Sequence, residues 1–311
     1  MSLSTSDKNS TTDINLVNLT NSANSTLKNS FAPFDPALQS AFENNVNAGI
    51  AEDVGSGDFT GMLVPADAMV KARVIVREEA VLCGAPWFEA VMQQLDSRIQ
   101  INWHYAEGDV MQADSLVCDI AAPARGLLTA ERGALNFLQL LSGVATATRS
   151  FVNLVADTNA KILDTRKTLP GLRLAQKYAV RVGGGHNQRL ALYDGILIKE
   201  NHIAAAGGIN AAMRAAQSLN AGVTIQIEVE NLVELDEALS AGATSILLDN
   251  FSLDAMRDAV KLTAGRALLE ASGGINMETV RAIAETGVDR ISIGSLTKDV
   301  KAADFSLRVL D

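Results

Sequence analysis

The stretch TIQIEVENLVELDEALSAGATSILLD, from Thr224 to Asp249, decides the fold of this chain. It contains two short apolar runs, at residues 224–229 and 245–248, and a helical pattern between them at residues 232–241. From the first run onward, predicted strands begin roughly every 22 residues, which is the length of one βα unit. Such alternation indicates parallel strands joined by right-handed crossovers.

The same alternation extends over most of the second half of the chain. A further helical pattern covers residues 277–286, and further strand-like apolar runs lie at residues 162–163, 196–198, 267–269 and 290–293. Parallel strands that alternate with helices can close into a barrel. We therefore predict an α/β fold with an open C-terminal βα barrel of six or seven parallel strands.

The first half has a mixed pattern. Apolar residues have helical spacing at residues 36–50, 86–95 and 129–141, and strand-like patterns occur at 72–77, 99–105 and 116–120. Strands grouped with helices on one face predict an N-terminal α+β sandwich domain over residues 31–141. The barrel is then the catalytic domain over 142–298, and residues 299–311 form a C-terminal segment that packs back on the N-terminal domain.

The first thirty residues form a separate compositional zone. Eighteen of them are Ser, Thr or Asn, and no periodic apolar face is visible. Such a segment cannot offset the entropy lost on ordering, so we expect residues 1–30 to be a disordered tail.

The overall composition excludes several classes of protein. The 311 residues include 26 Lys plus Arg and 36 Asp plus Glu, which gives a net charge of −10. General nucleic-acid binding and adhesion to an anionic membrane need a basic surface, so we expect neither. The start lacks a secretory signal, and the longest uncharged stretch, residues 133–148, is too polar and too short to cross a bilayer.

The cysteine content agrees with an intracellular setting. Cys83 and Cys118 are too few to build a disulfide framework, and no Cys/His cluster has zinc-ligand spacing. We expect a cytoplasmic protein with two reduced, buried thiols.

Polar side chains close the predicted barrel strands. In parallel βα folds the carboxyl ends of the strands form the mouth of the active site, so residues at these ends are candidate functional groups. The rival interpretation is that strands simply end in polar residues, but it does not explain the mixture of a cation, carboxylates and Gly-Ser turns. The residues at these ends are Asp164, Lys199, Glu228, Asp249, Ser272 and Ser295.

A basic segment interrupts this acidic chain. Between Thr165 and Tyr193 there are six basic residues and no acidic one. Three of them, Arg173, Lys177 and Arg181, are spaced four residues apart, and a solvated helix face explains these three as well as a binding role does.

The other three cations point to a ligand. Arg166, Lys167 and Arg189 flank a predicted strand end and a glycine triplet at 183–185, where the backbone can approach a ligand closely. Arginine binds carboxylate or phosphate through paired hydrogen bonds. Cations concentrated at the mouth of an acidic protein therefore indicate a polyanionic small molecule.

Two turns of small residues are candidate phosphate sites. Ser272-Gly273-Gly274 and Gly294-Ser295 each follow a predicted strand near the end of the barrel. Backbone N–H groups in such turns can surround a phosphate, and the loops after the last strands of βα barrels commonly hold one.

Glu228 and Asp249 end neighbouring predicted strands. They can hold Mg²⁺ through its waters or accept hydrogen bonds from sugar hydroxyls. A general acid–base pair and simple solvation of strand ends stay open as alternatives. His202, just after a strand end, fits a structural role as well as a functional one. Catalytic-triad, Walker and dinucleotide-binding patterns are all missing from the sequence.

Several specific motifs carry a family resemblance. The strongest are DTRKTLPGLR at 164–173, GGGHNQR at 183–189, LIKENH at 197–202 and IEVE at 227–230. Shorter matches are ED at 52–53, GDFT at 57–60, TAER at 129–132, LNF at 135–137, SGVAT at 142–146 and LDN at 248–250. From about residue 36 onward the chain resembles the quinolinate phosphoribosyltransferase family.

This resemblance implies a reaction and a role for each candidate residue. The family joins quinolinate to phosphoribosyl pyrophosphate with Mg²⁺, and releases nicotinate mononucleotide, pyrophosphate and CO₂ in NAD biosynthesis. By resemblance, the quinolinate carboxylates would be held by Arg132, Arg166, Arg189 and Lys199. Lys167 and Lys199 would also face the pyrophosphate, and Glu228 and Asp249 would face the ribose and Mg²⁺. The 5′-phosphate would be bound by Ser272, Gly273, Gly274, Gly294 and Ser295. In this family the sandwich of one subunit covers the barrel of its partner, so the resemblance implies a homodimer in which Arg132 acts in trans.

One position departs from the family pattern. Many members have histidine before the arginine at position 189, whereas this chain has Gln188. An amide can donate a hydrogen bond to a carboxylate but carries no charge.

Two alternative functions remain. One is a related phosphoribosyltransferase-like protein of molybdate operons with another substrate, which Arg132, Arg166 and Arg189 disfavour. The other is a non-catalytic sensor of a pyridine carboxylate, which Glu228 and Asp249 disfavour.

Overall fold

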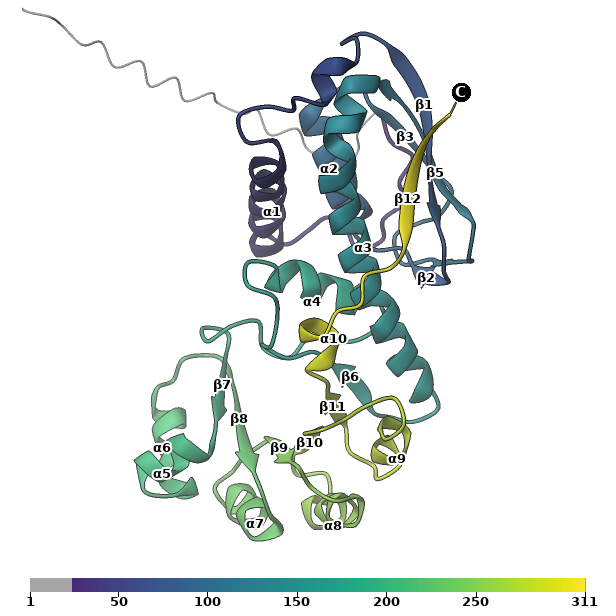
Figure 1. Cartoon of the computed structure of the whole chain (residues 1–311). Coiled ribbons are helices and arrows are strands. Elements are labelled where there is room, and N and C mark those ends of the chain that lie inside the picture. The colour runs from purple at the N-terminus through teal and green to yellow at the C-terminus, as the bar shows by residue number, and fades with distance from the viewer. Residues whose placement is uncertain (1–23, 311) are drawn as a thin grey trace, which may run out of the picture.

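The computed structural model describes residues 24–310, which form two lobes joined at a waist (Figure 1). The N-terminal lobe has an antiparallel sheet with helices on one face, and the C-terminal lobe has a parallel sheet with helices on its outer face. This arrangement confirms the α/β fold predicted from the sequence.

The antiparallel sheet is completed by the far end of the chain. Its strand order within the described residues is β12-β1-β5-β3, and Leu307 of β12 lies opposite Val74 of β1. Apolar residues alternate along β1, so that Ala72, Val74 and Val76 enter the core. The strands of this lobe are β1 (Met69–Val76), β2 (Ala80–Val81), β3 (Gln100–Trp103), β4 (Val110–Met111), β5 (Leu116–Pro123) and β12 (Phe305–Leu310).

Two helices cover one face of this sheet, and the first helix of the chain packs on their outer side (Figure 1). Asp35 caps the first, because its carboxylate accepts the backbone N–H groups of Ala37 and Leu38. Each of the first two helices has proline in its first turn, where the missing N–H costs nothing. The helices are α1 (Pro36–Val54), α2 (Ala85–Leu95) and α3 (Ala124–Leu154), with a short 3₁₀ turn η2 (Gly61–Leu63).

Helix α3 runs through the predicted domain boundary. Its 31 residues extend well beyond the helical pattern predicted at 129–141, so the boundary between 141 and 142 lies inside a helix. Gly143 does not interrupt α3. A Cβ at this position would come within 2.2 Å of the carbonyl oxygen of Lys301, so the glycine allows the returning C-terminal segment to pack against the helix.

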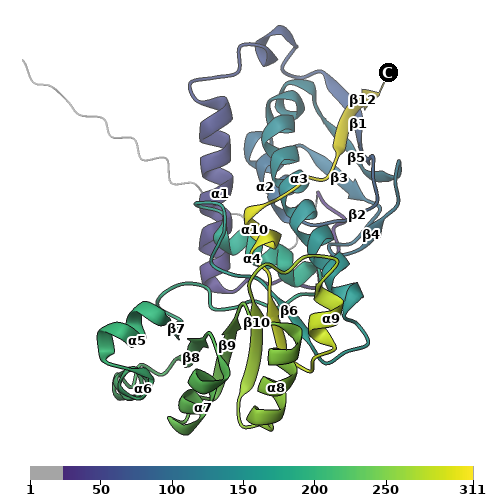
Figure 2. The same cartoon turned by 60° about the horizontal axis from the view of Figure 1, so that its bottom comes forward.

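The C-terminal lobe is an open barrel. Six parallel strands of the described chain follow the order β6-β11-β10-β9-β8-β7, and helices lie outside them (Figure 2). The strands are β6 (Lys161–Leu163), β7 (Gly195–Ile198), β8 (Thr224–Val229), β9 (Ser245–Asp249), β10 (Leu268–Ser272) and β11 (Arg290–Ser292). The helices are α5 (Glu200–Ala206), α6 (Ile209–Ser218), α7 (Leu232–Ser240), α8 (Leu253–Thr263), α9 (Val280–Ala284) and α10 (Ser295–Lys298).

One further helix, α4 (Arg173–Val182), connects the two lobes. It follows β6 in the chain, yet its apolar side chains are buried in the core of the N-terminal lobe. The Tyr178 ring packs against Phe34 and Trp87, and its hydroxyl donates a 2.9 Å hydrogen bond to Glu107. Burial raises the pKa of Glu107 to about 7. The position of α4 is therefore set by the N-terminal lobe.

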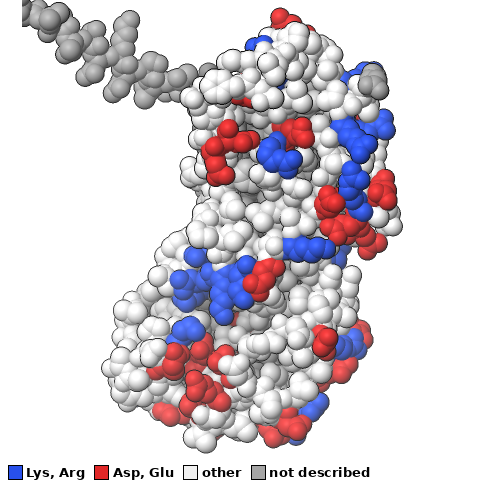
Figure 3. Space-filling view, viewed as in Figure 1, with Lys and Arg blue, Asp and Glu red and all other residues white. Residues whose placement is uncertain are grey.

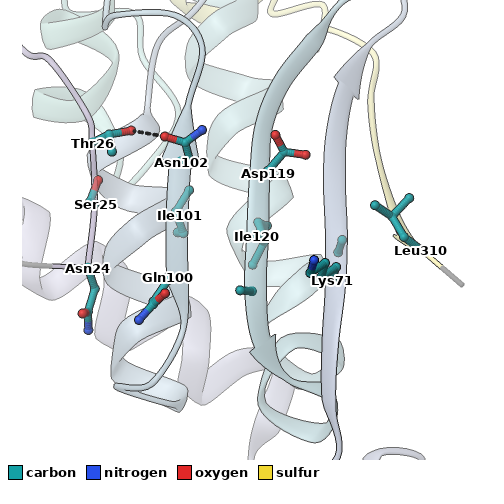
Figure 4. A pocket seen from close by; sticks show the side chains of 12 residues that line it. Asn24, Ser25, Thr26, Lys71, Gln100, Ile101, Asn102, Asp119, Ile120 and Leu310 are labelled. Carbon is teal, nitrogen blue, oxygen red and sulfur yellow. Dashed lines mark hydrogen bonds between the residues drawn. The ribbon is translucent and has the colours of Figure 1, made fainter.

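Residues 24–30 correct the prediction of a disordered tail. Ser25 forms a parallel bridge with Ile101 at the edge of β3, and the Thr26 hydroxyl donates to Asn102 at 3.2 Å (Figure 4). Further along, the Lys28 carbonyl accepts the backbone N–H of Glu107. The unpaired edge of β3 supplies the hydrogen-bonding groups that order this polar segment. Residues 1–23, the rest of the predicted tail, lie outside the described residues.

Two further predictions concern the cysteines and membrane-spanning helices. Cys83 and Cys118 are buried and free, as predicted. No helix within residues 24–310 is long and apolar enough to span a membrane.

Candidate active site

A cavity of about 640 Å³ lies at the carboxyl ends of the barrel strands. We call it the mouth cavity. Its volume is in the range of small-molecule sites. The predicted site residues that line it are Lys167, Lys199, Glu228, Asp249, Ser272, Gly273, Gly274, Gly294 and Ser295.

Charged groups on neighbouring strands form one wall of the mouth cavity. Lys199 follows β7 and its Nζ lies 2.8 Å from Glu228 Oε2 on β8. Asp249 ends β9 and accepts a hydrogen bond from the Asn250 amide at 2.9 Å. His202 Nδ1 accepts the backbone N–H of Lys199 at 3.0 Å, so this histidine caps α5, which is a structural role.

Two glycine turns after the adjacent strands β10 and β11 also line the mouth cavity. Gly273 and Gly274 have positive φ angles of 105° and 59°, which side chains rarely adopt. A Cβ at Gly273 would lie 2.0 Å from Asn250 Oδ1, and one at Gly294 would lie 3.2 Å from Lys167 Cδ. A Cβ at Gly274 would meet no atom within 4 Å, so the backbone there is open to a ligand, whereas Gly273 and Gly294 let Asn250 and Lys167 pack against the turns.

A second cavity, of about 590 Å³, is lined by inward-facing residues at the middle and amino ends of the strands. We call it the inner cavity. Gln188 and Arg189 line this inner cavity and not the mouth cavity, whereas Arg166 lines neither of the two. A guanidinium N–H of Arg189 donates to the Gly195 carbonyl at 2.9 Å. Burial, together with the charge of Arg166, lowers the pKa of Arg189.

Arg166 and Arg189 each keep a free hydrogen-bond donor. The Nε atoms of both guanidinium groups are buried and have no partner among residues 24–310. Buried donors without partners are rare in folded proteins and cost free energy. These two atoms are therefore available to an anionic ligand.

A buried ion pair fixes the segment that carries these residues. Asp164 Oδ1 lies 2.5 Å from Lys177 Nζ, and both side chains are inaccessible to solvent. Asp164 also accepts from the Asn187 amide at 2.6 Å and from the backbone N–H of Gln188 at 2.9 Å. Burial raises the pKa of Asp164 and lowers that of Lys177, and each partner opposes the shift of the other.

Two predictions from the sequence need correction here. A solvated helix face shared with Arg173 and Arg181 was one of two interpretations for Lys177, and it is wrong because α4 turns this side chain toward β6, where it is buried. Asp164 ends its strand as expected, but it is buried against Lys177 and does not line the mouth cavity.

Arg132 lines neither cavity of its own chain. It lies exposed on α3 in the N-terminal lobe. Arg125, on the same helix face, donates to the carbonyl groups of Gly61 and Val64 and so fixes η2 beside it. Large exposed apolar side chains surround this region: Phe59, Met62, Leu63 and Leu128.

The charge distribution agrees with the geometry of the two cavities. Lys and Arg side chains gather at the waist between β7 and α10, and Asp and Glu side chains border them (Figure 3). On this face the largest group of basic side chains thus lies where the barrel faces the N-terminal lobe, and smaller basic groups lie over the N-terminal lobe itself.

Sequence reasoning missed two buried groups of the barrel. Gln226 and Glu270 line the inner cavity, and neither was singled out. Each occurs two residues before a predicted site residue, Glu228 or Ser272, and alternation along a strand puts both pairs on the inward face. A polar residue at that spacing in an apolar run was the available signal.

Comparison with known proteins agrees with these observations. The family model "Quinolinate phosphoribosyl transferase, N-terminal domain" matches residues 58–142, and its C-terminal counterpart matches residues 144–308. A Bacillus subtilis protein, "Probable nicotinate-nucleotide pyrophosphorylase [carboxylating]", is 43% identical over 259 residues, which cover 83% of this chain and 90% of that protein.

Further relatives cover a similar extent. A Mycobacterium leprae nicotinate-nucleotide pyrophosphorylase [carboxylating] is 40% identical over 274 residues, 86% of this chain and 96% of that protein. The solved structure of the nicotinate-nucleotide pyrophosphorylase from Francisella tularensis superposes with a TM-score of 0.85 at 46% identity, and the match covers 87% of this chain and 96% of the other.

Proposed function

Since the chain belongs to the quinolinate phosphoribosyltransferase family, we propose that it transfers a phosphoribosyl group from phosphoribosyl pyrophosphate to quinolinate. Loss of CO₂ then gives nicotinate mononucleotide, with pyrophosphate as the other product. The observation that carries the proposal is the mouth cavity, which combines three lysines, three carboxylates and two glycine turns at and just beyond the strand ends.

The sugar phosphate is assigned to the mouth cavity. Backbone N–H groups of the turns at 272–274 and 294–295 would bind the 5′-phosphate, because such turns can surround an anion. Lys167 and Lys199 would stabilise the charge that develops on departing pyrophosphate. Glu228 and Asp249 would accept hydrogen bonds from the ribose hydroxyls.

Quinolinate is assigned to the neighbourhood of Arg166 and Arg189. Their unpartnered Nε atoms offer donors to its two carboxylates. The pyridine nitrogen is its own nucleophile, so the protein has no proton to remove and acts by positioning and electrostatics. Once the C–N bond exists, the cationic ring accepts the electron pair left by the 2-carboxylate, which departs as CO₂.

A divalent cation is part of the proposal, and the donors present fit Mg²⁺ only together with substrate. No group of three His, Cys, Asp or Glu suited to a metal occurs within residues 24–310. Mg²⁺ keeps several waters and commonly binds through one or two carboxylates plus substrate phosphates. Glu228 and Asp249 would hold it, through water, and it would neutralise charge on the pyrophosphate.

A homodimer with Arg132 acting in trans completes the proposed site. Arg132 is exposed on its own lobe beside the exposed apolar side chains of η2 and α3. Such a patch is typical of a protein interface. A second copy related by a two-fold axis would cover the patch and bring Arg132 to the barrel of the partner.

The test is a product assay with purified protein. Incubation with quinolinate, phosphoribosyl pyrophosphate and Mg²⁺ should give nicotinate mononucleotide and CO₂ in equal amounts. Nicotinate should be a poor substrate, because a buried guanidinium left without its carboxylate costs about 1–3 kcal/mol. Comparable turnover with nicotinate, or no turnover with quinolinate, would contradict the proposal.

A further inference from the structure

Three polar side chains are hydrogen-bonded in series across the interior of the barrel. Gln188 Nε2 donates to Gln226 Oε1 at 2.9 Å, and Gln226 Nε2 donates to Glu270 Oε2 at 2.9 Å. Gln226 and Glu270 are buried, and all three residues line the inner cavity. Apolar side chains usually fill such interiors, so this series, which we call the interior network, is a departure from ordinary barrel packing.

The interior network has a direction. Glu270 lies at one end of the interior network and accepts a hydrogen bond there. Gln226 therefore turns its N–H₂ group toward Glu270 and its carbonyl toward Gln188. Gln188 must then direct one of its N–H groups at Gln226. Its side chain makes no other hydrogen bond within residues 24–310. One N–H and the carbonyl of the Gln188 amide are therefore left for a ligand.

The backbone of Gln188 is fixed as well. Its N–H donates to Asp164 Oδ1 at 2.9 Å, and its carbonyl accepts from Lys177 Nζ at 2.9 Å. Both partners are buried, so the peptide groups on either side of this residue have little freedom. Gln226 holds the side chain as well, so the Gln188 amide is oriented before any ligand binds. This pre-orientation lowers the entropy cost of binding.

Glu270 is kept in the barrel although its environment is unfavourable. Its Oε1 atom is buried and has no partner among the described residues. Burial raises the pKa of this carboxyl, while Gln226, the nearby Ser292 hydroxyl and the Arg290 charge oppose that shift. A half-satisfied buried carboxyl costs stability, so an apolar residue here would give a more stable core. This cost favours a role for Glu270 in the site.

We propose that Gln226 and Glu270 are positioning residues that hold the Gln188 amide as an uncharged, pre-oriented donor to a carboxylate bound beside Arg189. The identity of that ligand as quinolinate rests on the proposed function, but the interior network does not. The guanidinium groups supply positive charge to the carboxylate, and the fixed amide supplies a hydrogen bond of defined geometry. The interior network would thus take part in selecting the dicarboxylate.

Steady-state kinetics test the inference. Gln188→Ala, Gln226→Leu and Glu270→Gln should each raise KM for quinolinate about tenfold, the effect of one hydrogen bond. KM for phosphoribosyl pyrophosphate and kcat should stay within about twofold, as expected when only ground-state binding changes. The double variant Gln188→Ala/Gln226→Leu should be no worse than Gln188→Ala. Effects that multiply would overturn the inference, because they would show independent structural roles.

A matched control separates positioning from general packing. Thr286 is another buried polar side chain of the barrel, and its hydroxyl donates to the Ile283 carbonyl away from the interior network. Thr286→Val should lower stability and leave KM for quinolinate unchanged. An equal rise in KM for Thr286→Val would assign the effect to loosened packing and overturn the inference.

A final measurement does not depend on activity. In a crystal structure of the unliganded Gln226→Leu variant, the Gln188 amide should leave the orientation described above, while its backbone bonds to Asp164 and Lys177 persist. An unchanged amide would overturn the inference. Absence of turnover in the wild-type protein would contradict the proposed function alone, since this structural result stands without it.

Discussion

Two lysine–carboxylate pairs in the barrel have nearly the same chemistry and opposite surroundings. The atoms of the Lys177–Asp164 pair lie 2.5 Å apart, with side-chain exposures of 1% and 0%. Those of the Lys199–Glu228 pair lie 2.8 Å apart, with exposures of 44% and 11%. The first pair also binds the segment 187–188, whereas the second lines the mouth cavity.

This difference in solvent exposure implies different roles for the two ion pairs. A buried ion pair gains little over an apolar pair, but removing one partner leaves a charge without solvent, so the Lys177–Asp164 pair mainly fixes geometry. A half-exposed pair adds little to stability and can exchange its partner for a substrate at small cost. The same residue types thus fix the backbone in one place and, in the proposed function, bind the substrate in the other.

The largest expected effect is on the buried pair. Lys177→Met should lower the free energy of unfolding by about 3–5 kcal/mol, because Asp164 is left buried without its counterion. Urea unfolding of the variant measures this loss. Adding Asp164→Asn removes the unpaired carboxyl and preserves the acceptor for Asn187, so the double variant should regain part of the stability. A double variant no more stable than Lys177→Met would contradict the account.

The exposed pair should show the reverse pattern. Lys199→Ala, and likewise Lys167→Ala, should lower kcat by about 100- to 1000-fold, because these cations act on charge formed in the transition state. Their stability should stay within about 1 kcal/mol of wild type. Turnover and urea unfolding of the same preparations check both statements. Near-normal turnover would assign the lysine to the solvated surface.

An intermediate effect tests whether the partner subunit contributes a cation. Arg132→Ala and Arg166→Ala homodimers should both be nearly inactive. After joint unfolding and refolding, a mixed dimer contains one intact site, so activity should recover to about a quarter of wild type with random pairing. Native mass spectrometry verifies that mixed dimers form. If they form without recovered activity, Arg132 does not act in trans.

The smallest effect concerns the N-terminal segment. Removing residues 1–23 should leave activity and stability unchanged, because the family resemblance begins only at about residue 36. Removing residues 1–30 should cost about 1–3 kcal/mol, since it exposes the edge of β3 and leaves the Glu107 N–H without its Lys28 acceptor. Thermal melts of the two truncations make the comparison. Equal melting temperatures would show that residues 24–30 contribute nothing.

Strand patterns gave most of the fold because each barrel strand is an apolar run that ends in a polar residue. The runs at 224–229 and 290–293 coincide with β8 and β11 to within one residue. Helix ends were less accurate, because α3 continues through Gly143, where tertiary packing overrides a local helix breaker. Polar strand ends, the basic segment and the two glycine turns pointed to the predicted residues that line the mouth cavity, because these features lie at or just beyond the carboxyl ends of the strands.

The residues that sequence reasoning misjudged owe their environment to distant parts of the chain. The sequence left Lys177 open between a solvated face and a binding role, because helical spacing reveals a face but not its partner, and here the partner is Asp164. Residues 24–30 have no apolar pattern, and the open edge of β3 orders them instead. Gln188 lines the inner cavity and not the mouth cavity, and no local sequence pattern encodes this difference.

The return of β12 to the N-terminal sheet has a consequence for biosynthesis. A ribosome makes the chain from its N-terminus at about 5–20 residues per second, so β12 emerges roughly 10–40 s after β5. Until then β1 is an edge strand that can pair with β1 of another nascent chain. The N-terminal lobe can become complete only after the whole barrel has been translated, so we expect newly made chains to depend on chaperone capacity during that interval.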